Sequence, residues 1–592
     1  MNRKARRAAS KQAMSGARVA AMPTADALAQ AEVLYHAGAL AKAEELCLSV
    51  LAREPAHARC LNLLGLIAQA GGQHRRAVNY FGRALEVAPR DALCWCNAGR
   101  SYQALNQQQK ARHAFRQAIT AGWYEMDFVA LVLTAPAIAG PVKRLEDAWP
   151  ARPAPQTVFG PAGLSTIARD ALFLSLLESM PLADMALEAL LTAARAFLLR
   201  LASDDKNVGD EIVEFAAALA QQCFLNEYVF AQSADELSML DRLSATLSSC
   251  GTGALPFRLA VLACYQPLST APGIDSLLQR QWPEPIQALI RQQVREPREE
   301  AQDRATIPAV TSVDEASLEV MRQYEESPYP RWAIERPWRK SAQAASPLDI
   351  LVAGCGTGWH VIQVARQFPN ARILAVDLSK ASLAYAQRKA RELGLCTIEF
   401  AQADILNLRQ IGRSFDTIET VGVLHHLVDP GAGLDVLAAL LRPDGEMRIG
   451  LYSKLARRHI VEARALIHEQ GYSARAEDIR RFRQDVLAGD YRGRWRQLVI
   501  CPDFYSMSGC RDLVFNVQEH QFGIPELESL LAERGLAFDG FEIGPTVVDA
   551  FRRRFPATNA LLDLKAWSAF EADNPDIFRS MYVFVARKQP LA

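Results

Sequence analysis

Three glycines within five residues follow a short aliphatic run in the second half of the chain. Residues 350–353 read as a strand buried on both faces, because no polar residue interrupts them, and amphipathic helical spacing resumes after Trp359. Gly354, Gly356 and Gly358 therefore occupy a strand-to-helix turn. Without Cβ atoms they permit positive φ and let a ligand reach main-chain N–H groups at the positive end of a helix. The turn suits a nucleotide-like ligand, although a tight structural turn would show the same glycines.

Acidic residues follow the next two predicted strands. Asp377 comes directly after the aliphatic run 373–376, where a carboxylate can accept hydrogen bonds from both hydroxyls of a ribose. Asp404 ends the segment "TIEFAQAD", where its side chain can meet an adenine amino group. Carboxyl ends of parallel strands form the ligand-binding edge of open α/β sheets, so both carboxylates are expected beside the glycine turn.

Two cofactor classes use a glycine turn followed by an acidic residue. The dinucleotide fingerprint is G-x-G-x-x-G, whereas this turn is G-x-G-x-G ("GCGTG"), and a nucleoside needs no cradle for a pyrophosphate. The ordered motifs "VAGCGTG", "AVDLS", "QADIL", "VGVLHHLVDP" and "LLRPDGEMRIG" resemble the class I S-adenosylmethionine-dependent methyltransferases over about residues 316–590. A nicotinamide-dinucleotide domain is the alternative.

The resemblance implies an α/β Rossmann-like domain with a mostly parallel seven-stranded sheet. The segments 537–544 and 580–588 read as its last two strands, and the resemblance makes the final strand antiparallel. It also implies S-adenosyl-L-methionine as cofactor and no metal. The cofactor-binding residues that it implies are Gly354, Cys355, Gly356, Thr357, Gly358, Asp377, Leu378, Asp404 and Ile405.

Two histidines follow the fourth predicted strand. His425 and His426 lie within reach of the expected crevice, and imidazole has a pKa suited to a general base. A base is required only if the methyl acceptor is a hydroxyl or a protonated amine. Packing inside the following helix is the other interpretation.

The segment "QYEESPYPRWAIERPW", residues 323–338, contains two X-Pro steps and several aromatics. It therefore predicts an irregular clamp over the carboxyl edge of the sheet. Arg331 can pair bidentately with the carboxylate of the cofactor's tail, and Tyr329 can pack against the sulfonium or the substrate. Simple aromatic packing is the alternative.

A long segment at about 453–536 separates the fifth and sixth predicted strands. Its stretch "RRFRQDVLAGDYRGRWRQL" is basic and helix-like. Asp485 and Asp490 dilute that charge, which favours an amphipathic lid helix over contact with nucleic acid. The whole chain has 66 Lys plus Arg and 66 Asp plus Glu, so no global field favours a polyanion either.

Residues 24–122 repeat themselves with a period of 34 residues. Gly65 recurs as Gly99 and Phe81 as Phe115, a pattern that resembles about three tetratricopeptide repeats. Small residues let two antiparallel helices approach closely, while the phenylalanines fill the groove to the next unit. Such an array holds a protein or peptide partner, unless it merely dimerises or braces an enzyme.

The remaining segments complete a multidomain prediction of an N-terminal α-solenoid, an all-α middle region and a C-terminal α/β domain. Residues 1–23 are predicted to be a basic disordered tail, 123–300 a helical middle domain and 301–315 a charged linker to the domain at 316–592. Eleven cysteines without a CxxC pair indicate a reducing cytoplasm, and no apolar run reaches the length of a membrane span.

The predicted function is S-adenosylmethionine-dependent methyl transfer to an unidentified acceptor, with the repeats presenting a protein substrate. The arrangement resembles bacterial tetratricopeptide-repeat methyltransferases, including "NEYVF" and "SGCRDLVFNVQEH". The alternative is a binding scaffold whose methyltransferase fold senses the cofactor without catalysis. The sequence leaves the oligomeric state open.

Overall fold

The structure is a computed structural model that describes residues 22–160, 163–204, 206–247, 253–333, 347–579 and 581–588. Most of the predicted basic tail, residues 1–21, lies outside the described residues. The chain forms two compact units. One contains Arg169–Ser179 and the described part of Met1–Ala139, and the other contains nearly all of the remaining chain.

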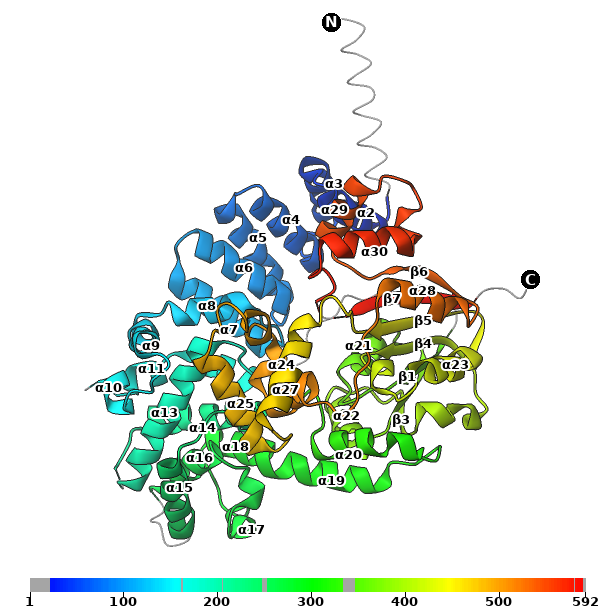
Figure 1. The fold of residues 1–592 in the computed structure, drawn as a ribbon. Helices are drawn as coiled ribbons and strands as arrows, with labels where there is room; N and C mark the ends of the chain where they lie inside the picture. Colours follow the sequence, from blue (N-terminus) through cyan, green and yellow to red (C-terminus); the bar gives the residue numbers. More distant parts are fainter. Residues whose placement is uncertain are drawn as a thin grey trace, which may run out of the picture. The chain divides into compact units, whose positions relative to one another are not determined.

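The first unit is built from antiparallel helix pairs (Figure 1). Three pairs follow one another along the chain: α2 (Thr24–His36) with α3 (Leu40–Arg53), α4 (Ala58–Ala70) with α5 (His74–Val87), and α6 (Ala92–Ala104) with α7 (Gln108–Thr120). Helices α8 (Met126–Leu133) and α12 (Ala171–Ser179) extend the array, and α12 packs on α7. Residues 169–179 therefore belong to the first unit, whereas we expected them in the middle domain. The reason is that α12 packs on α7 with its apolar residues buried.

The repeated small residues permit the close approach of paired helices. A Cβ on Gly65 would lie 2.3 Å from the ring of Phe81, and a Cβ on Gly99 would lie 2.3 Å from the ring of Phe115. Each phenylalanine therefore fills the space above the glycine of its own repeat. Phe115 also stacks on Phe128 of α8 at 4.4 Å between ring centroids, so this ring contacts the next helix as well.

The second unit begins with the helical middle region. Its principal helices are α9 (Pro136–Ala148, which begins in the first unit), α13 (Met185–Ser203), α14 (Asp210–Leu225), α15 (Ala234–Thr246), α16 (Leu255–Ala263), α18 (Glu284–Ile290) and α19 (Glu296–Thr306), joined by the short helices α10 (Pro155–Phe159), α11 (Ser165–Ala168) and α17 (Ile274–Leu277). Helix α14 is central, because it buries alanines, Leu219 and Cys223 on nearly every side.

A seven-stranded sheet follows in the same unit (Figure 1). Its strands are β1 (Asp349–Ala353), β2 (Arg372–Asp377), β3 (Ile398–Gln402), β4 (Phe415–Val421), β5 (Leu441–Leu451), β6 (Leu536–Phe541) and β7 (Tyr582–Lys588), in the order β3-β2-β1-β4-β5-β7-β6. Strands β1 to β5 pair in parallel and β7 is antiparallel to both neighbours. The predicted fold class is confirmed.

Alternate residues of the central strands supply two separate hydrophobic cores. Ile350 and Val352 pack on one face with α21 (Trp359–Gln367) and α22 (Lys380–Glu392). Leu351 and Ala353 pack on the other face with α23 (Pro430–Leu440) and α28 (Ile524–Ala532). Because both faces are covered, the strands read as continuous apolar runs.

The segment expected to be a linker is part of the second unit. Helix α19 continues to Thr306, where Arg391 of α22 forms an ion pair with Asp303 at 2.8 Å. The next residues pair with the edge of the sheet, since the main chains of Pro308 and Val310 exchange hydrogen bonds with Gln402. These contacts fix residues 301–315 against the α/β domain, so they do not form a free linker.

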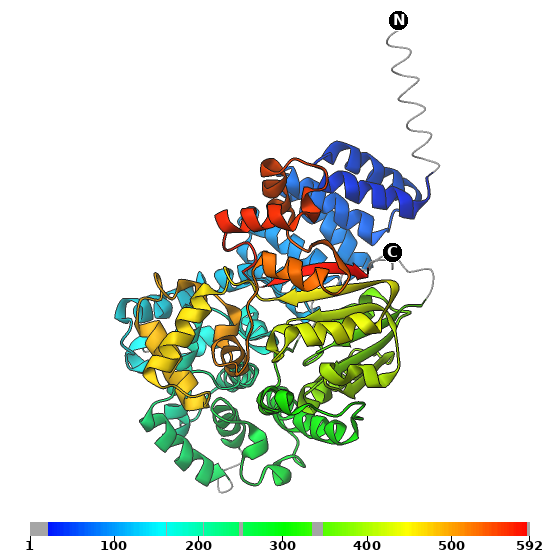
Figure 2. The same ribbon diagram turned by 45° about the vertical axis from the view of Figure 1, so that its right-hand side comes forward.

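The long segment between β5 and β6 is helical, as predicted. It contains α24 (Arg458–Gln470), α25 (Ala476–Ala488), α26 (Arg496–Val499) and α27 (Met507–Val514), and lies beside the middle helices (Figure 2). Helices α29 (Pro545–Arg554) and α30 (Leu564–Asp573) separate β6 from β7. A fully buried ion pair joins α25 to α13, from Arg483 Nη2 to Glu188 Oε2 at 2.6 Å. The insertion is therefore anchored to the middle region.

Within the described residues, no single helix is long and apolar enough to cross a membrane. One bent pair of helices, Asp127–Leu133 with Pro136–Ala148, is long and apolar enough to cross one, judged by length and composition alone.

Candidate functional site

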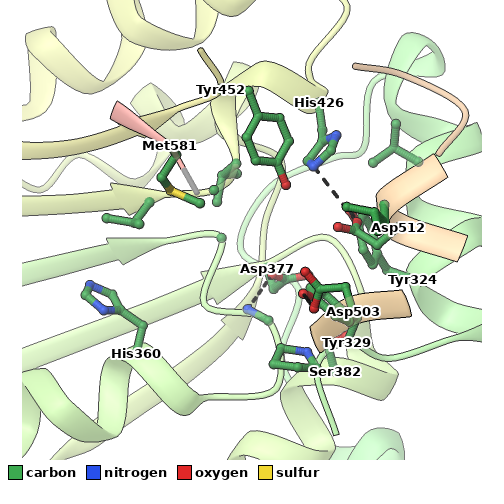
Figure 3. Close-up of a pocket in the computed structure, with 18 of the residues that line it drawn as sticks. Tyr324, Tyr329, His360, Asp377, Ser382, His426, Tyr452, Asp503, Asp512 and Met581 are labelled. Atoms are coloured by element: carbon green, nitrogen blue, oxygen red, sulfur yellow. Dashed lines mark hydrogen bonds and ion pairs between the residues drawn. The ribbon is translucent and has the colours of Figure 1, made fainter. Parts of the chain in front are cut away.

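A cavity of about 750 Å³ lies at the carboxyl edge of the sheet (Figure 3). One side is formed by the glycine turn and the residues that follow β2 and β3. The other is formed by the residues that follow β4 and β5, by helix α20 (Leu318–Glu326) with the segment after it, and by the insertion. From the predicted site residues it brings together Tyr329, Gly354, Cys355, Gly356, Asp377, Leu378, Asp404, Ile405 and His426.

The glycine turn has the left-handed geometry that its composition predicts. Gly354, Gly356 and Gly358 all have left-handed backbones, with φ of 80°, 52° and 87°. A Cβ on Gly354 would lie 2.4 Å from Val423, and a Cβ on Gly358 would lie 2.7 Å from Ala386. Glycine is therefore required twice over, for conformation and for space.

Asp377 holds the turn against the end of β2. Its Oδ2 accepts the N–H of Gly356 at 2.8 Å and its Oδ1 accepts the N–H of Ser379 at 2.9 Å. A carboxylate has about four acceptor positions, so it can still accept hydroxyl groups from the cavity. Burial raises the pKa of Asp377, and the two N–H donors oppose that shift. The residue thus fits the ribose of a nucleoside.

Asp404 is buried after β3 and begins a 3-10 turn. Its Oδ1 accepts the N–H of Leu406 at 3.0 Å and its Oδ2 accepts the N–H of Asp314 at 2.9 Å. The side chain lines the cavity with 1% of the residue exposed. It ties residues 311–314 to the sheet, and its contact with an adenine stays a prediction.

Two carboxylates face the cavity from the insertion, each held by a tyrosine (Figure 3). The hydroxyl of Tyr329 donates to Asp503 Oδ1 at 2.6 Å, and the hydroxyl of Tyr324 donates to Asp512 Oδ1 at 2.6 Å. Burial raises the pKa of Asp503, with a further contribution from the charge of Asp512. Burial and the neighbouring carboxylates also hold the pKa of both tyrosines well above the usual value, so both remain donors. We call these four side chains the acidic wall.

His426 faces the acidic wall from the end of β4. Its Nδ1 lies 2.7 Å from the main-chain oxygen of Gln518, which fixes Nδ1 as the protonated nitrogen of the neutral ring. Its Nε2 lies 4.0 Å from Asp512 Oδ1. The ring of Tyr452 lies 6.0 Å away between centroids, at 82° to the imidazole. In the neutral tautomer, Nε2 is therefore the nitrogen that carries the lone pair, and it lies beside the wall.

His425 does not reach the cavity. It is fully buried and its ring lies 3.7 Å from that of Tyr452, while neither ring nitrogen has a hydrogen-bond partner among the described residues. Burial, together with the charge of His426, lowers its pKa well below the usual range. His425 therefore packs as a neutral ring and has a structural role.

Arg331 does not line the cavity either, although its neighbours Tyr329 and Pro330 do. Its Nε donates to Glu227 Oε1 at 3.1 Å, and its guanidinium lies 5.0 Å from the ring centroid of Phe224. Arg331 thus pairs with Glu227 of the middle region, whereas we expected it to pair with the carboxylate of the cofactor. The irregular segment itself starts later than expected, because helix α20 continues to Glu326.

Two residues of the turn support the cavity without lining it. The hydroxyl of Thr357 donates to the main-chain oxygen of Pro330 at 2.5 Å, and the indole of Trp332 donates to the oxygen of Thr357 at 3.2 Å. Gly358 begins helix α21 and lies against α22. These contacts fasten the segment around Pro330 to the turn.

Three ionisable side chains form a cluster near the glycine turn. His360 Nε2 contacts Glu419 Oε2 at 2.9 Å, and Arg448 Nη1 lies 3.3 Å from the same oxygen. Arg448 also binds Glu542. The histidine lowers the pKa of the mostly buried Glu419, although burial opposes that shift.

Family comparisons identify two regions of the chain. Residues 350–445 match the family described as a methyltransferase domain, and residues 58–91 and 92–121 match the tetratricopeptide repeat. The chain carries a methyltransferase domain. The match covers β1 to the start of β5, including the glycine turn, and S-adenosylmethionine is the cofactor of this domain. The recognised resemblance is confirmed for both regions.

Curated relatives match mainly over short stretches. An uncharacterized protein of Synechococcus is 33% identical over 203 residues, which are 32% of this chain and 48% of that protein. The malonyl-[acyl-carrier protein] O-methyltransferase of Hahella chejuensis is 35% identical over 101 residues, 17% of this chain and 35% of that enzyme. The chain thus spans about half or less of the length of these two relatives.

Among solved structures, that of PKMT2 from Rickettsia typhi covers 42% of this chain and 51% of its own length, at 17% identity and a TM-score of 0.33. This likeness is too low to support an inference.

The sequence did not predict the two carboxylates of the acidic wall in the methyltransferase domain. It predicted only the segment that carries the two tyrosines. Asp503 and Asp512 lie in the insertion, outside the matched family region, and no spacing pattern marks them. The available signal was the pair of tyrosines before β1, which needed acidic or amide partners once buried. Tyr452, directly before the insertion, was also missed.

Proposed function

We propose that the protein is an S-adenosylmethionine-dependent methyltransferase whose acceptor is an amine. The observation that carries the proposal is a single cavity that joins the glycine turn and Asp377 to the acidic wall. A cofactor site with no second compartment would fit a sensor equally well. A cavity lined by both sets of residues favours catalysis over the scaffold alternative.

The chain's own residues supply the cofactor's binding determinants. S-adenosylmethionine supplies, when bound, a methyl group on a positively charged sulfur. Asp377 would hold the ribose hydroxyls, and the main chain from Gly354 to Gly356 would lie against the nucleoside. The aromatic rings of Tyr329 and Tyr452 exclude water from the cavity, which helps to align a nucleophile and a methyl group.

The acidic wall favours an acceptor that carries positive charge. Asp503 and Asp512 are held toward the cavity by tyrosine hydroxyls, and burial raises the pKa of Asp503 although the positive charge of Arg457 opposes that shift. An ammonium group would stabilise both carboxylates, and the surrounding tyrosine rings add cation–π attraction. A neutral phenol or a carboxylate would gain neither contribution.

His426 is our proposed acceptor for the proton that an ammonium group must lose before it can be methylated. Gln518 fixes its tautomer, so Nε2 carries the free lone pair. Asp512, 4.0 Å from Nε2, would stabilise the imidazolium that forms. His425 has no comparable role, because it lies outside the cavity.

The repeats are proposed to recruit a protein that bears the amine. Tetratricopeptide repeats form arrays that present an extended surface to peptides or proteins. The Hahella chejuensis relative named above is an O-methyltransferase, and an oxygen acceptor is the competing proposal.

Tritiated methyl transfer distinguishes these acceptors. The full-length protein is incubated with labelled S-adenosylmethionine and lysate from a strain that lacks its gene. We expect label in protein that survives mild base and that acid hydrolysis releases as an N-methylated amino acid, because O-methyl ethers also survive base. Asp512→Asn should lower this transfer at least tenfold, with S-adenosylhomocysteine affinity within threefold. The exposed Asp485→Asn variant is the matched control. Base-labile label would contradict the amine and indicate a methyl ester. Cofactor binding with no transfer to any component would favour the sensor.

A further inference from the structure

Helix α14 of the middle region ends in a strained turn. Glu227 and Tyr228 both have left-handed backbones, with φ of 57° and 60°. This conformation is unfavourable for residues that carry a Cβ, and two in succession persist only where the surroundings hold them. The contacts of the turn must therefore compensate for its strain.

Those contacts reach the insertion of the methyltransferase domain. The main-chain oxygen of Asn226 accepts the N–H of Met507 at 3.1 Å, and Glu227 Oε2 accepts the N–H of Ser508 at 2.6 Å. Met507 and Ser508 begin helix α27, whose first N–H groups have no partners within the helix. The carboxylate of Glu227 also lies at the positive end of that helix, where an anion is stabilised. The turn thus caps α27 from another region of the chain.

The second carboxylate oxygen of Glu227 holds the segment before β1. Glu227 Oε1 accepts from Arg331 Nε at 3.1 Å. Only 16% of the Glu227 side chain and 23% of the Arg331 side chain are exposed, so water screens the pair weakly. Tyr329 lies two residues before Arg331 and is hydrogen-bonded to Asp503.

One side chain therefore links the two elements that meet at the acidic wall. Helix α27 carries Asp512, and the segment before Arg331 carries Tyr329. Glu227 itself does not line the cavity. We propose that Glu227 is a positioning residue for methyl transfer, through which the middle region sets the geometry of the acidic wall. This inference rests on the proposed function, because it assigns the wall to the acceptor.

The position of Glu227 predicts a specific defect. Its side-chain hydrogen bonds reach Arg331 and Ser508, and none in the described structure reaches the glycine turn, Asp377 or Asp404. The cofactor side is linked to Glu227 only indirectly, through Pro330 and Trp332, which hydrogen-bond with Thr357. Loss of its charge should therefore disturb the acceptor side much more than the cofactor side. A residue that served only general stability would affect both sides together.

The test compares full-length Glu227→Gln with Glu214→Gln, an exposed glutamate on α14, the helix that precedes the turn. Glutamine keeps the shape of the side chain and removes the charge. We expect amide hydrogen exchange at Met507 and Ser508 to accelerate at least tenfold, and tritiated methyl transfer into lysate to fall at least tenfold. Affinity for S-adenosylhomocysteine should stay within twofold, and Glu214→Gln should match the wild type in all three measurements.

A charge swap separates the two contacts of Glu227. Glu227→Arg with Arg331→Glu restores an ion pair but removes the acceptor for the Ser508 N–H. We expect methyl transfer to remain low, and recovery to the wild-type rate would overturn the role of the helix cap.

Two further outcomes bear on the proposal. Normal methyl transfer in Glu227→Gln, or a parallel loss of cofactor affinity, would overturn the positioning role. If the wild-type protein transfers no methyl group, the proposed function fails, whereas the exchange measurement still tests the link. Unchanged exchange at Met507 and Ser508 would then overturn the link as well.

Discussion

Replacement of Asp377 by asparagine tests the cofactor site most directly. The carboxylate accepts main-chain N–H groups from Gly356 and Ser379 through different oxygens. An asparagine amide has one oxygen, so its NH₂ group must face one of those donors. The variant therefore loses a charged acceptor for two ribose hydroxyls and gains a donor–donor conflict. Hydrogen bonds to charged groups contribute about 1.5–3 kcal/mol each, of which the remaining amide oxygen recovers part.

We expect a net loss of about 2–3 kcal/mol in the binding of S-adenosylhomocysteine, or about 30- to 150-fold in Kd, measured by calorimetry on the full-length protein. Adenosine should lose a similar factor. Because 2′,3′-dideoxyadenosine lacks both ribose hydroxyls, its weaker binding should barely change. Equal losses for adenosine and its dideoxy analogue would refute the assignment of Asp377 to the ribose.

A control variant and the pH dependence sharpen this experiment. Asp416 is also a hydrogen-bonded aspartate of the sheet, but it pairs with the main chain of Asp349 and with Arg442 outside the cavity. Asp416→Asn should leave adenosine binding within twofold. Burial raises the pKa of Asp377, so its carboxylate protonates at a higher pH than an ordinary aspartate. Adenosine binding should therefore weaken as pH falls through that raised pKa, and Asp377→Asn should remove this pH dependence.

Three further outcomes are expected from the packing. Gly99→Ala should destabilise the repeats by about 1–3 kcal/mol in thermal unfolding because a Cβ there meets a phenyl ring at 2.3 Å, whereas the helical Gly82→Ala, with nothing within 4 Å, should be neutral or stabilising. Glu188→Ala should cost about 3–5 kcal/mol in urea unfolding by stranding the buried charge of Arg483, and adding Arg483→Met should recover much of that loss; additive losses would contradict the coupling. Deletion of 1–122 should leave S-adenosylhomocysteine affinity intact and lower methyl transfer into lysate, and equal transfer would leave the repeats as a brace.

The cofactor side of the cavity was predictable because its determinants are local. A strand, a turn and a helix follow one another within 350–367, and only glycine tolerates the observed φ of 80° at Gly354 together with the nearby Val423 side chain. The position of Asp377 follows from the same rule, since it ends the next strand. Short-range constraints of this kind leave a visible pattern in the sequence.

The acidic wall was not predictable because distant segments build it. Tyr329 and Asp503 are 174 residues apart, and Glu227 and Ser508 are 281 residues apart. Residues that meet in this way need no spacing rule. Arg331 illustrates the consequence, because its segment was placed correctly at the cavity while its charge is taken by Glu227 from another region. Short-range sequence patterns identify the segment around Arg331 but not its distant partner Glu227.

His425 and His426 show how the same limit applies to adjacent residues. They belong to the 3-10 turn Leu424–His426, in which successive side chains diverge by about 120°. Only one of two neighbours can then face a given cavity. The sequence places both at the end of β4, but the choice depends on Tyr452, which packs on His425, and on Gln518, which binds His426. Both contacts come from the chain after β4, so the tautomer and the access of the proposed base are set by β5 and the insertion rather than by the motif that contains the histidines.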